Sequence, residues 1–346
     1  MYYKKIQIIL WTKKNRFVEY CNFFVYNTNE EIHLGGDTLK YYIGIDGGGT
    51  KTAFVIGNSD GLVLKTIEKS GCSHRSIGID AVVSLIKKGV REILQGVGAL
   101  PKECAGCCIG LPCFGEFPRA DIKIKEKLDE ALYPIPVYIV NDAVVGWAGS
   151  LECNEGIHLV AGTGALAYAR TDDGREARSN GWSEFFSDEG SCYWVGKQAI
   201  SLFAMEADGR REKGALYDIV KEELDINNVI EFIEIIERDY APRRHTVASF
   251  QILAKKAALA GDEEAKKLYV AAAKHLADSA YGIIKQLGWE GRKINVSYFG
   301  GLFKSGSLVL EPLKKYLDEI GCTMSPPKRT ATEGALLLSI KNFKKE

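Results

Sequence analysis

Glycine, hydroxyl and acidic side chains follow one another closely around residue 46 of this chain. Residues 41–46 read YYIGID, an apolar strand that ends in Asp46, and residues 47–52 read GGGTKT. Because glycines lack side chains, this turn can aim several backbone N–H groups at a phosphate, and Asp46 can then hold a hydrated Mg²⁺. The predicted phosphate-binding residues of this turn are Gly48, Gly49, Thr50 and Lys51. The alternative is an ordinary hairpin turn with a surface lysine, because residues 52–58 (TAFVIGN) are also strand-like.

The turn belongs to neither of the two commonest nucleotide-binding motifs. A Walker A loop and a dinucleotide-binding turn each lead into a helix, whereas a second strand follows the glycines here. The order of strand, glycine turn and strand therefore indicates another nucleotide-binding fold.

Four later segments also combine apolar runs with glycines or acidic residues. Residues 139–143 (IVNDA) end an apolar run at Asp142, and residues 156–164 (GIHLVAGTG) repeat the strand and the glycine turn. Residues 181–194 (GWSEFFSDEGSCYW) are rich in aromatic and acidic side chains, and residues 296–303 (VSYFGGLF) lead from a strand into two glycines. Taken alone, two glycines after a strand usually mark the entry to a helix.

In this order, the segments resemble the motifs of the superfamily of sugar kinases, heat-shock ATPases and actin. Within it they are most similar to the N-acetylglucosamine kinase and BadF-type (BadF/BadG/BcrA/BcrD) ATPase family. The resemblance runs from about residue 40 to about residue 340, and residues 181–194 carry its most specific motif. It implies that ATP binds between two glycine turns, with the adenosine near a Gly-Gly pair. The residues so implied are Gly162, Thr163 and Gly164 for the second turn, and Gly300 and Gly301 for the adenosine.

The same resemblance implies residues that act on a sugar. Asp142 matches the catalytic base, which accepts the proton of the attacking hydroxyl while the phosphoryl group moves in line. The implied sugar-binding residues are Ser73, Asp142, Gly181, Trp182 and Asp188. Simpler alternatives exist: Asp142 and Asp188 could each cap the helix that follows them, and Trp182 could be a core aromatic.

The chain departs from the family pattern at three places. Residues 71–78 read GCSHRSIG, where relatives often carry an Asn that contacts an N-acetyl sugar. Ser73 reaches less far than an Asn amide, which puts N-acetylglucosamine itself in question as the substrate. Ala165 replaces a hydroxyl residue and Ser187 replaces a glycine, but neither change removes a carboxylate or a phosphate-binding glycine.

Composition narrows the class of protein. A chain of 346 residues that is 46% hydrophobic is long enough for two domains. Its 45 basic and 45 acidic residues leave no net charge, and the absence of a long basic stripe argues against nucleic acid as a partner. The nine cysteines lie mostly in apolar runs without the paired spacing of a zinc site. We expect reduced thiols in a cytoplasmic protein.

The first 38 residues differ from the rest. Their main apolar run, residues 6–11, is too short to span a bilayer, and the segment lacks the cleavage site of a secretory signal. Residues 34–40 (LGGDTLK) can be encoded by a ribosome-binding sequence followed by a TTG start codon at Leu39. We therefore expect residues 1–38 to be a leader that arises from a mis-assigned start.

The order of predicted elements indicates the fold. Three strands up to about residue 69 precede a helix over 81–95, and strands then alternate with helices up to residue 140. The pattern starts again at residue 156, and residues 193–286 are largely helical. With the resemblance, this predicts an α/β protein of two ribonuclease H-like domains, the actin-like ATPase fold, with a cleft between them. The expected domains are residues 39–150 and 151–346. Packing of the last helix against the first domain is left open.

The resulting hypothesis is an ATP-dependent kinase that phosphorylates an amino sugar such as N-acetylglucosamine, with ATP and Mg²⁺ as cofactors. Its expected partner is a small-molecule sugar, with no nucleic acid, no membrane and a homodimer left open. One alternative is a BadF-type ATPase that activates a dehydratase or reductase through an iron–sulfur cluster, which requires exposed cysteines. The other is a sugar sensor that binds its ligand without turnover.

Overall fold

The structure is a computed structural model that describes residues 5–7, 22–24 and 40–344. In the first unit of the chain, residues 1–40, β1 (Lys5–Gln7) and β2 (Asn22–Phe24) pair antiparallel. Apart from these two strands, the expected leader of residues 1–38 lies outside the described residues. The second unit, residues 41–346, contains every predicted site residue.

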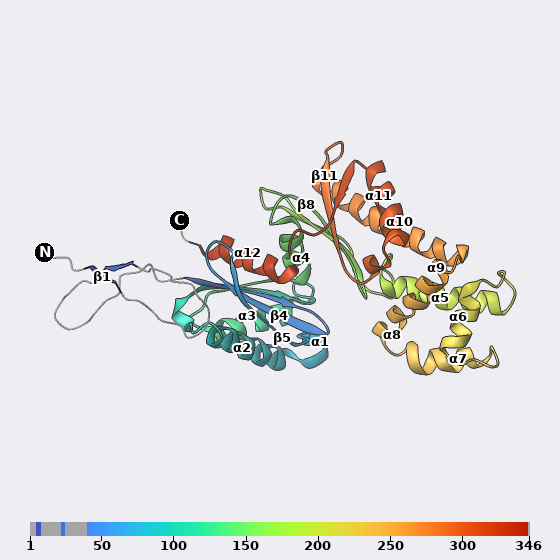
Figure 1. The fold of residues 1–346 in the computed structure, drawn as a ribbon, viewed down its shortest axis with the longest axis horizontal. Helices are drawn as coiled ribbons and strands as arrows, with labels where there is room; N and C mark the ends of the chain where they lie inside the picture. The colour runs from blue at the N-terminus through green and yellow to red at the C-terminus, as the bar shows by residue number, and fades with distance from the viewer. Residues whose placement is uncertain (1–4, 8–21, 25–39, 345–346) are drawn as a thin grey trace. The chain divides into compact units, whose positions relative to one another are not determined.

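A five-stranded mixed sheet forms the first half of this second unit (Figure 1). In spatial order its strands are β5 (Val63–Ser70), β4 (Lys51–Gly57), β3 (Tyr41–Gly47), β6 (Cys104–Leu111) and β7 (Val137–Asn141). The first three strands form an antiparallel meander, and β6 and β7 run parallel to β3. The loops that follow β3, β6 and β7 therefore meet at one edge of the sheet, where α/β proteins bind their ligands.

Helices cover both faces of this sheet. Ile43 and Ile45 of β3 pack in one buried cluster with apolar residues of α2 (Ile79–Gln95) and α3 (Pro118–Leu132). Tyr42, which points to the opposite face because side chains alternate along a strand, packs with Leu336. Shorter elements connect these parts: α1 (His74–Ile77) and η1 (Pro101–Glu103).

The last helix, α12 (Ala331–Phe343), packs on the first sheet and on α4 (Asp142–Leu151). A Cβ on Gly44 of β3 would lie only 2.8 Å from the carbonyl carbon of Ala335 in α12. A Cβ on Gly334 would overlap the backbone of Gly149 in α4. These glycines therefore allow α12 to approach both elements closely.

A second five-stranded sheet repeats the strand pattern of the first. In spatial order its strands are β10 (Glu176–Asn180), β9 (Ala165–Arg170), β8 (Gly156–Ala161), β11 (Ile294–Phe299) and β12 (Cys322–Ser325). Again a three-stranded meander precedes two parallel strands. The predicted duplication of the starting pattern is confirmed.

Helices make up most of the remaining second half. They are α5 (Cys192–Ala207), α6 (Ala215–Glu223), α7 (Glu231–Ile235), η2 (Ile236–Tyr240), α8 (Arg244–Ser249), α9 (Gln251–Leu259), α10 (Glu263–Leu287), η3 (Leu302–Ser305) and α11 (Ser307–Glu319). Within the described ranges, no helix combines the length and the apolar composition needed to cross a bilayer.

Candidate active site

The first glycine turn joins β3 to β4 and packs against the loop after β5. The N–H of Gly48 donates to the carbonyl of Lys51 at 2.8 Å, and the N–H of Cys72 donates to the carbonyl of Gly48 at 3.0 Å. A Cβ on Gly47 would overlap the Cys72 sulfur, whereas a Cβ on Gly49 would meet no described atom within 4 Å. The turn is thus a tight hairpin, as the alternative expected, and its Gly49 side is also open to a ligand.

Lys51 forms an ion pair with a carboxylate on the neighbouring strand β5. Its Nζ lies 2.8 Å from Oε1 of Glu68 on β5, and both side chains are exposed. This hydrogen-bonded pair raises the pKa of Lys51. Exposed ion pairs exchange easily for other partners, so the pair is compatible with a phosphate contact.

Asp46 and Asp142 lie at the same edge of the first sheet. Asp46 is opposite Gly110 in the register of β3 and β6, and Leu111 is opposite Asn141 in that of β6 and β7. Burial raises the pKa of Asp46 to about 6, against the opposing effect of Lys51. Burial and, after it, the charge of Asp46 raise the pKa of Asp142 to about 7. The two carboxyl groups are therefore close enough for the charge of Asp46 to affect the ionisation of Asp142.

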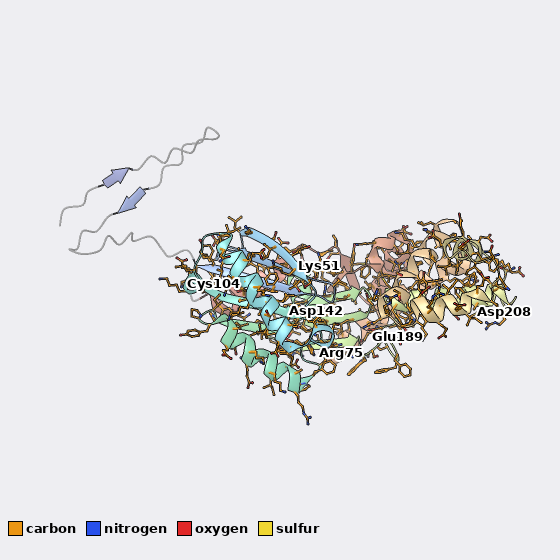
Figure 2. The ribbon with its side chains drawn as sticks, turned by 90° about the horizontal axis from the view of Figure 1, so that it is seen from below. Lys51, Arg75, Cys104, Asp142, Glu189 and Asp208 are labelled. Atoms are coloured by element: carbon orange, nitrogen blue, oxygen red, sulfur yellow. The ribbon has the colours of Figure 1, made fainter. Side chains whose placement is uncertain are left out.

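The cap of α4 is Asn141 and not Asp142. The Asn141 Oδ1 accepts the N–H of Ala143 at 3.0 Å, and its Nδ2 donates to the carbonyl of Phe114 at 2.9 Å. The capping alternative for Asp142 is thus wrong, because the N-cap position and its side-chain hydrogen bond belong to Asn141. Asp142 is the first helical residue, at the edge where the turn after β3 also lies (Figure 2).

The second glycine turn follows β8 and contacts the Gly-Gly segment after β11. The N–H of Gly162 donates to the carbonyl of Gly164 at 2.9 Å. Gly300 has a φ of +128°, and a Cβ there would overlap the carbonyl of Ala161 and lie 2.9 Å from the Gly162 nitrogen. The structure therefore brings together the residues predicted for the second phosphate turn and for the adenosine, although they are far apart in sequence.

Asp188 supports this second turn. Its carboxylate accepts the N–H of Ala165 at 3.3 Å and pairs with Arg244, and a Cβ on Gly164 would lie 3.2 Å from both of its oxygens. Burial raises the pKa of Asp188, and Arg244 partly opposes that shift. The cap of α5 is Ser191, which accepts the N–H of Trp194, so the capping alternative for Asp188 is also wrong.

The predicted sugar segment exposes its aromatic side chains. Trp182 is 76% exposed, so the alternative of a core aromatic is wrong. Phe185 and Phe186 are also exposed and lie edge to face, with 6.4 Å between ring centroids. Gly181 before them has a φ of +73°, which glycine adopts without strain.

Ser73 lies at the edge of the first sheet, directly after the buried Cys72. It occupies the cap position of α1, and the next residue, His74, lies edge to face with Phe117 at 5.7 Å between centroids. The guanidinium of Arg75 lies over the Phe117 ring, 5.3 Å from its centroid.

The family model that describes the BadF/BadG/BcrA/BcrD ATPase family matches residues 43–339. This chain belongs to that family. The match includes both glycine turns and all of the predicted site residues.

Two curated relatives of this chain are sugar kinases by name. The chain is 31% identical over 281 residues to the N-acetylmuramic acid/N-acetylglucosamine kinase of Clostridium acetobutylicum, covering 81% of this chain and 91% of that protein. It is 27% identical over 292 residues to the N-acetyl-D-glucosamine kinase of Dictyostelium discoideum, with 81% and 91% covered.

Solved structures show the same fold. A candidate N-acetylglucosamine kinase from Chromobacterium violaceum superposes with a TM-score of 0.69 at 23% identity, over 88% of this family member and all of the other chain. A ROK family glucokinase from Streptomyces griseus gives a TM-score of 0.53 at 15% identity, over 88% and 99% of the two chains. The predicted α/β fold of two actin-like ATPase domains is confirmed.

Two arginines that were not identified from the sequence, Arg178 and Arg244, form ion pairs with acidic residues near the candidate active site. Arg244 lies 56 residues after Asp188, and Arg178 lies 62 residues after its partner Glu116. Neither pair has a regular spacing, so the sequence contains no signal for them. Asn180 had a local signal, since an Asn-Gly pair often marks a turn: its Oδ1 accepts the N–H of Asp188 at 2.9 Å.

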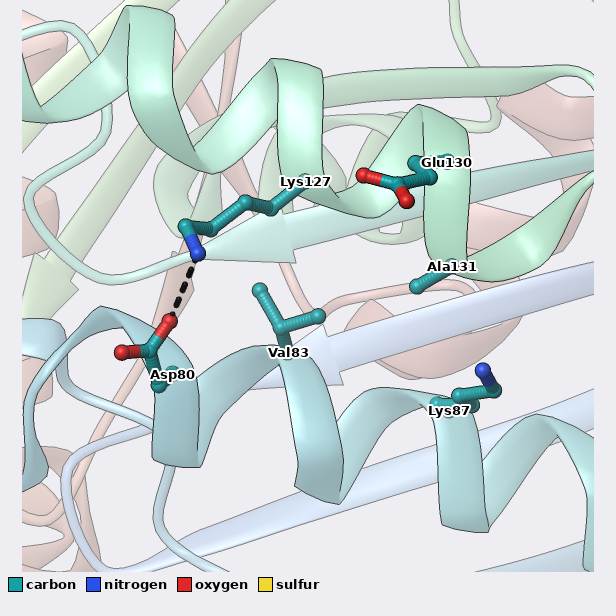
Figure 3. A pocket seen from close by; sticks show the side chains of 6 residues that line it. All are labelled: Asp80, Val83, Lys87, Lys127, Glu130 and Ala131. Atoms are coloured by element: carbon teal, nitrogen blue, oxygen red, sulfur yellow. Dashed lines mark ion pairs between the residues drawn. The ribbon is translucent and has the colours of Figure 1, made fainter.

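A surface pocket of about 230 Å³ between α2 and α3 lies apart from these residues (Figure 3). It is lined by Asp80, Val83, Lys87, Lys127, Glu130 and Ala131. Asp80 and Lys127 form an exposed ion pair across it at 2.9 Å. Since none of the predicted site residues lines this pocket, it is not the candidate active site.

Proposed function

We propose that this protein is an ATP-dependent kinase that transfers a phosphoryl group to a hydroxyl of an amino sugar. The observation that carries the proposal is the pair of carboxyl groups, Asp46 and Asp142, at the edge of the sheet where the first glycine turn lies. The named activities of the Clostridium and Dictyostelium relatives support a sugar as the acceptor.

ATP would bind through backbone groups of the two glycine turns. Gly49 leaves open space at the first turn, and a Cβ on Gly162 would likewise meet no described atom within 4 Å. Such open glycines fit phosphate oxygens, which need close approach to backbone N–H groups. Gly300 and Gly301 would lie against the adenosine, because Gly300 contacts the second turn directly.

The residues at the first sheet also fit a magnesium ion. In the described part of the chain, no group of three or more His, Cys, Asp or Glu side chains could hold a metal. Magnesium bound together with a nucleotide needs only one or two carboxylates, because phosphates and water complete its shell. Asp46 would hold the ion, which would neutralise charge on the phosphate oxygens. Asp46 is half-buried, and burial raises the pKa of its carboxyl to about 6. A bound cation would stabilise the charged carboxylate, so Asp46 fits this role.

Asp142 would act as the general base. With its pKa raised to about 7, it can accept a proton from the sugar hydroxyl near neutral pH and still release it to water. Its place at the start of α4 holds the carboxyl at the sheet edge, while Asn141 satisfies the helix end.

The sugar would lie between the loop that contains Ser73 and the segment that contains Gly181 and Trp182. An exposed indole offers a flat apolar face for the C–H groups of a sugar ring, and hydroxyl or carboxyl groups nearby can fix its orientation. We propose that the first domain ends at residue 150 and the second begins at residue 151. Closure of the two domains would then bring the Ser73 loop and the Trp182 segment together over the substrates.

The cysteines disfavour the rival activity as an activator of a dehydratase. Cys113 and Cys153 are half-buried, and the other six described cysteines are buried. Burial raises the pKa of the Cys72 and Cys192 thiols to about 11. Such thiols are poor ligands for an iron–sulfur cluster.

The test is ADP release measured with a panel of amino sugars, anhydro-sugars and no sugar. We expect at least one amino sugar to raise the rate by roughly tenfold or more over the sugar-free rate, since only a bound sugar presents the base with a hydroxyl held in position for attack. Equal rates for all sugars and for no sugar would contradict the proposal.

A further inference from the structure

An ion pair joins the first sheet to the predicted sugar segment beside Asp142. Nη1 of Arg178, on β10, donates to Oε1 of Glu116, in the loop after β6, at 2.7 Å. Nη2 of Arg178 donates to the carbonyl of Gly181. The two side chains are 36% and 31% exposed, so the pair is partly withdrawn from water. Through Arg178, a residue of the first half is thus linked to the residue that precedes Trp182.

Charged and titratable groups surround Asp142 from several elements. Asp46 approaches from β3, Glu116 from the loop after β6, and Arg178 from β10. The Cys72 and Cys113 thiols are also close enough for Asp142 to raise the pKa of each. Burial and Asp46 raise the pKa of Asp142 most, Glu116 raises it further, and Arg178 lowers it. Arg178 and Glu116 therefore act on Asp142 with opposite signs.

We propose that Arg178 is a positioning residue for the reaction, which holds Glu116 and the Gly181 carbonyl in place and so sets the balance of charge around Asp142. This inference rests on the proposed kinase function. A guanidinium is suited to the role because its planar fork bonds two acceptors at once and stays charged at all relevant pH values. A sugar that moves the segment around Gly181 would also move the cation near the base.

The proposal predicts shifts of opposite sign in two variants. For Arg178→Gln, loss of the cation should move the acid limb of kcat/KM for the amino sugar to higher pH. For Glu116→Gln, loss of the anion should move it to lower pH. We expect each shift to be roughly half to one pH unit, as for one unit charge at a partly screened distance. The double variant should return close to the wild-type limb.

Two further variants separate this role from a structural one. Arg178→Lys keeps the charge but not the fork, so it should retain the wild-type acid limb while the KM for the sugar rises. Arg175→Gln is the matched control, because Arg175 pairs with Asp173 in the turn before β10; it should leave the profile unchanged.

Shifts in the same direction, or lower kcat with an unmoved acid limb in all Arg178 and Glu116 variants, would overturn the inference. If Arg178→Gln fails to fold, Arg178→Lys and Glu116→Gln still test it. The outcome differs from failure of the kinase proposal, in which the wild-type protein itself would show no stimulation by any sugar.

Discussion

The two glycine turns occupy equivalent places in two sheets of the same topology, yet their carboxyl groups have different surroundings. At the second turn, Asp188 pairs with Arg244 and accepts the N–H of Ala165. At the first turn, the ion pairs of the described residues include none with Asp46 or Asp142. The comparison teaches that the repeated fold supplies two similar backbone cradles, while the proton and metal chemistry that we propose belongs to the first. The second uses its acid to support the turn.

The strongest test of this difference is removal of the proposed base. Asp142→Asn keeps the shape of the side chain, so turnover should fall by roughly two to four powers of ten while ATP affinity stays nearly unchanged. Steady-state ADP release and nucleotide titration measure the two quantities. The melting temperature should hold, because Asn141 provides the cap; a collapse of folding would mean that Asp142 is structural after all.

The two glycine turns should differ in how much stability an added methyl group costs, because Gly300, which contacts the second turn, is crowded and Gly49 is open. Gly300→Ala should cost about 1–3 kcal/mol of unfolding free energy, because its φ of +128° and its contact with Ala161 leave no room. Gly49→Ala should leave stability within about 1 kcal/mol but raise the KM for ATP, since the open space at the first turn is where phosphate would approach. Urea denaturation and ATP saturation curves check both. Equal stability losses in the two variants would remove the distinction.

The unpaired acid of the first turn also predicts a pH effect on stability. Because the pKa of Asp46 is raised to about 6 in the folded protein, the folded state binds its proton more tightly than the unfolded state. Its contribution is therefore most favourable below the unfolded pKa of about 4 and is lost as pH rises through about 6. Asp46→Asn should flatten this part of the curve of stability against pH, measured by urea denaturation from pH 4 to pH 8. A curve identical to that of the wild type would show that Asp46 is well solvated or paired.

The smallest effect is expected at the edge of the sugar region. If Ser73 faces the sugar, Ser73→Asn should shift the ratio of kcat/KM toward N-acetylglucosamine over glucosamine by roughly tenfold, because an amide offers more donors and acceptors to the N-acetyl group. The same panel of sugars measures the ratio. An unchanged ranking would place Ser73 outside the pocket and leave specificity to the segment around Trp182.

Much of the molecule follows from local pattern alone. The alternation and length of the apolar runs predicted the succession of strands and helices along the chain, including the helix that became α2, because strand and helix periods are set by backbone geometry. The glycine turns were predictable for the same reason: only glycine permits backbone to pack as closely as it does at Gly47 and Gly300. Family membership followed from the order of these motifs.

Only the tertiary structure decided the hydrogen-bond partners and the electrostatic environment of Asp46, Asp142 and Asp188. Asn141 and Asp142 are adjacent polar residues that look alike in sequence, and only the structure shows that Asn141 caps α4. Likewise, only the structure shows that Asp188 accepts a hydrogen bond from the second turn and does not cap α5. The partners Arg178 and Arg244 come from distant segments with no periodic relation to the acids they meet. Electrostatic environment is a property of packing across the fold, since burial and the nearest charges, not neighbours in the chain, set the ionisation of Asp46 and Asp142.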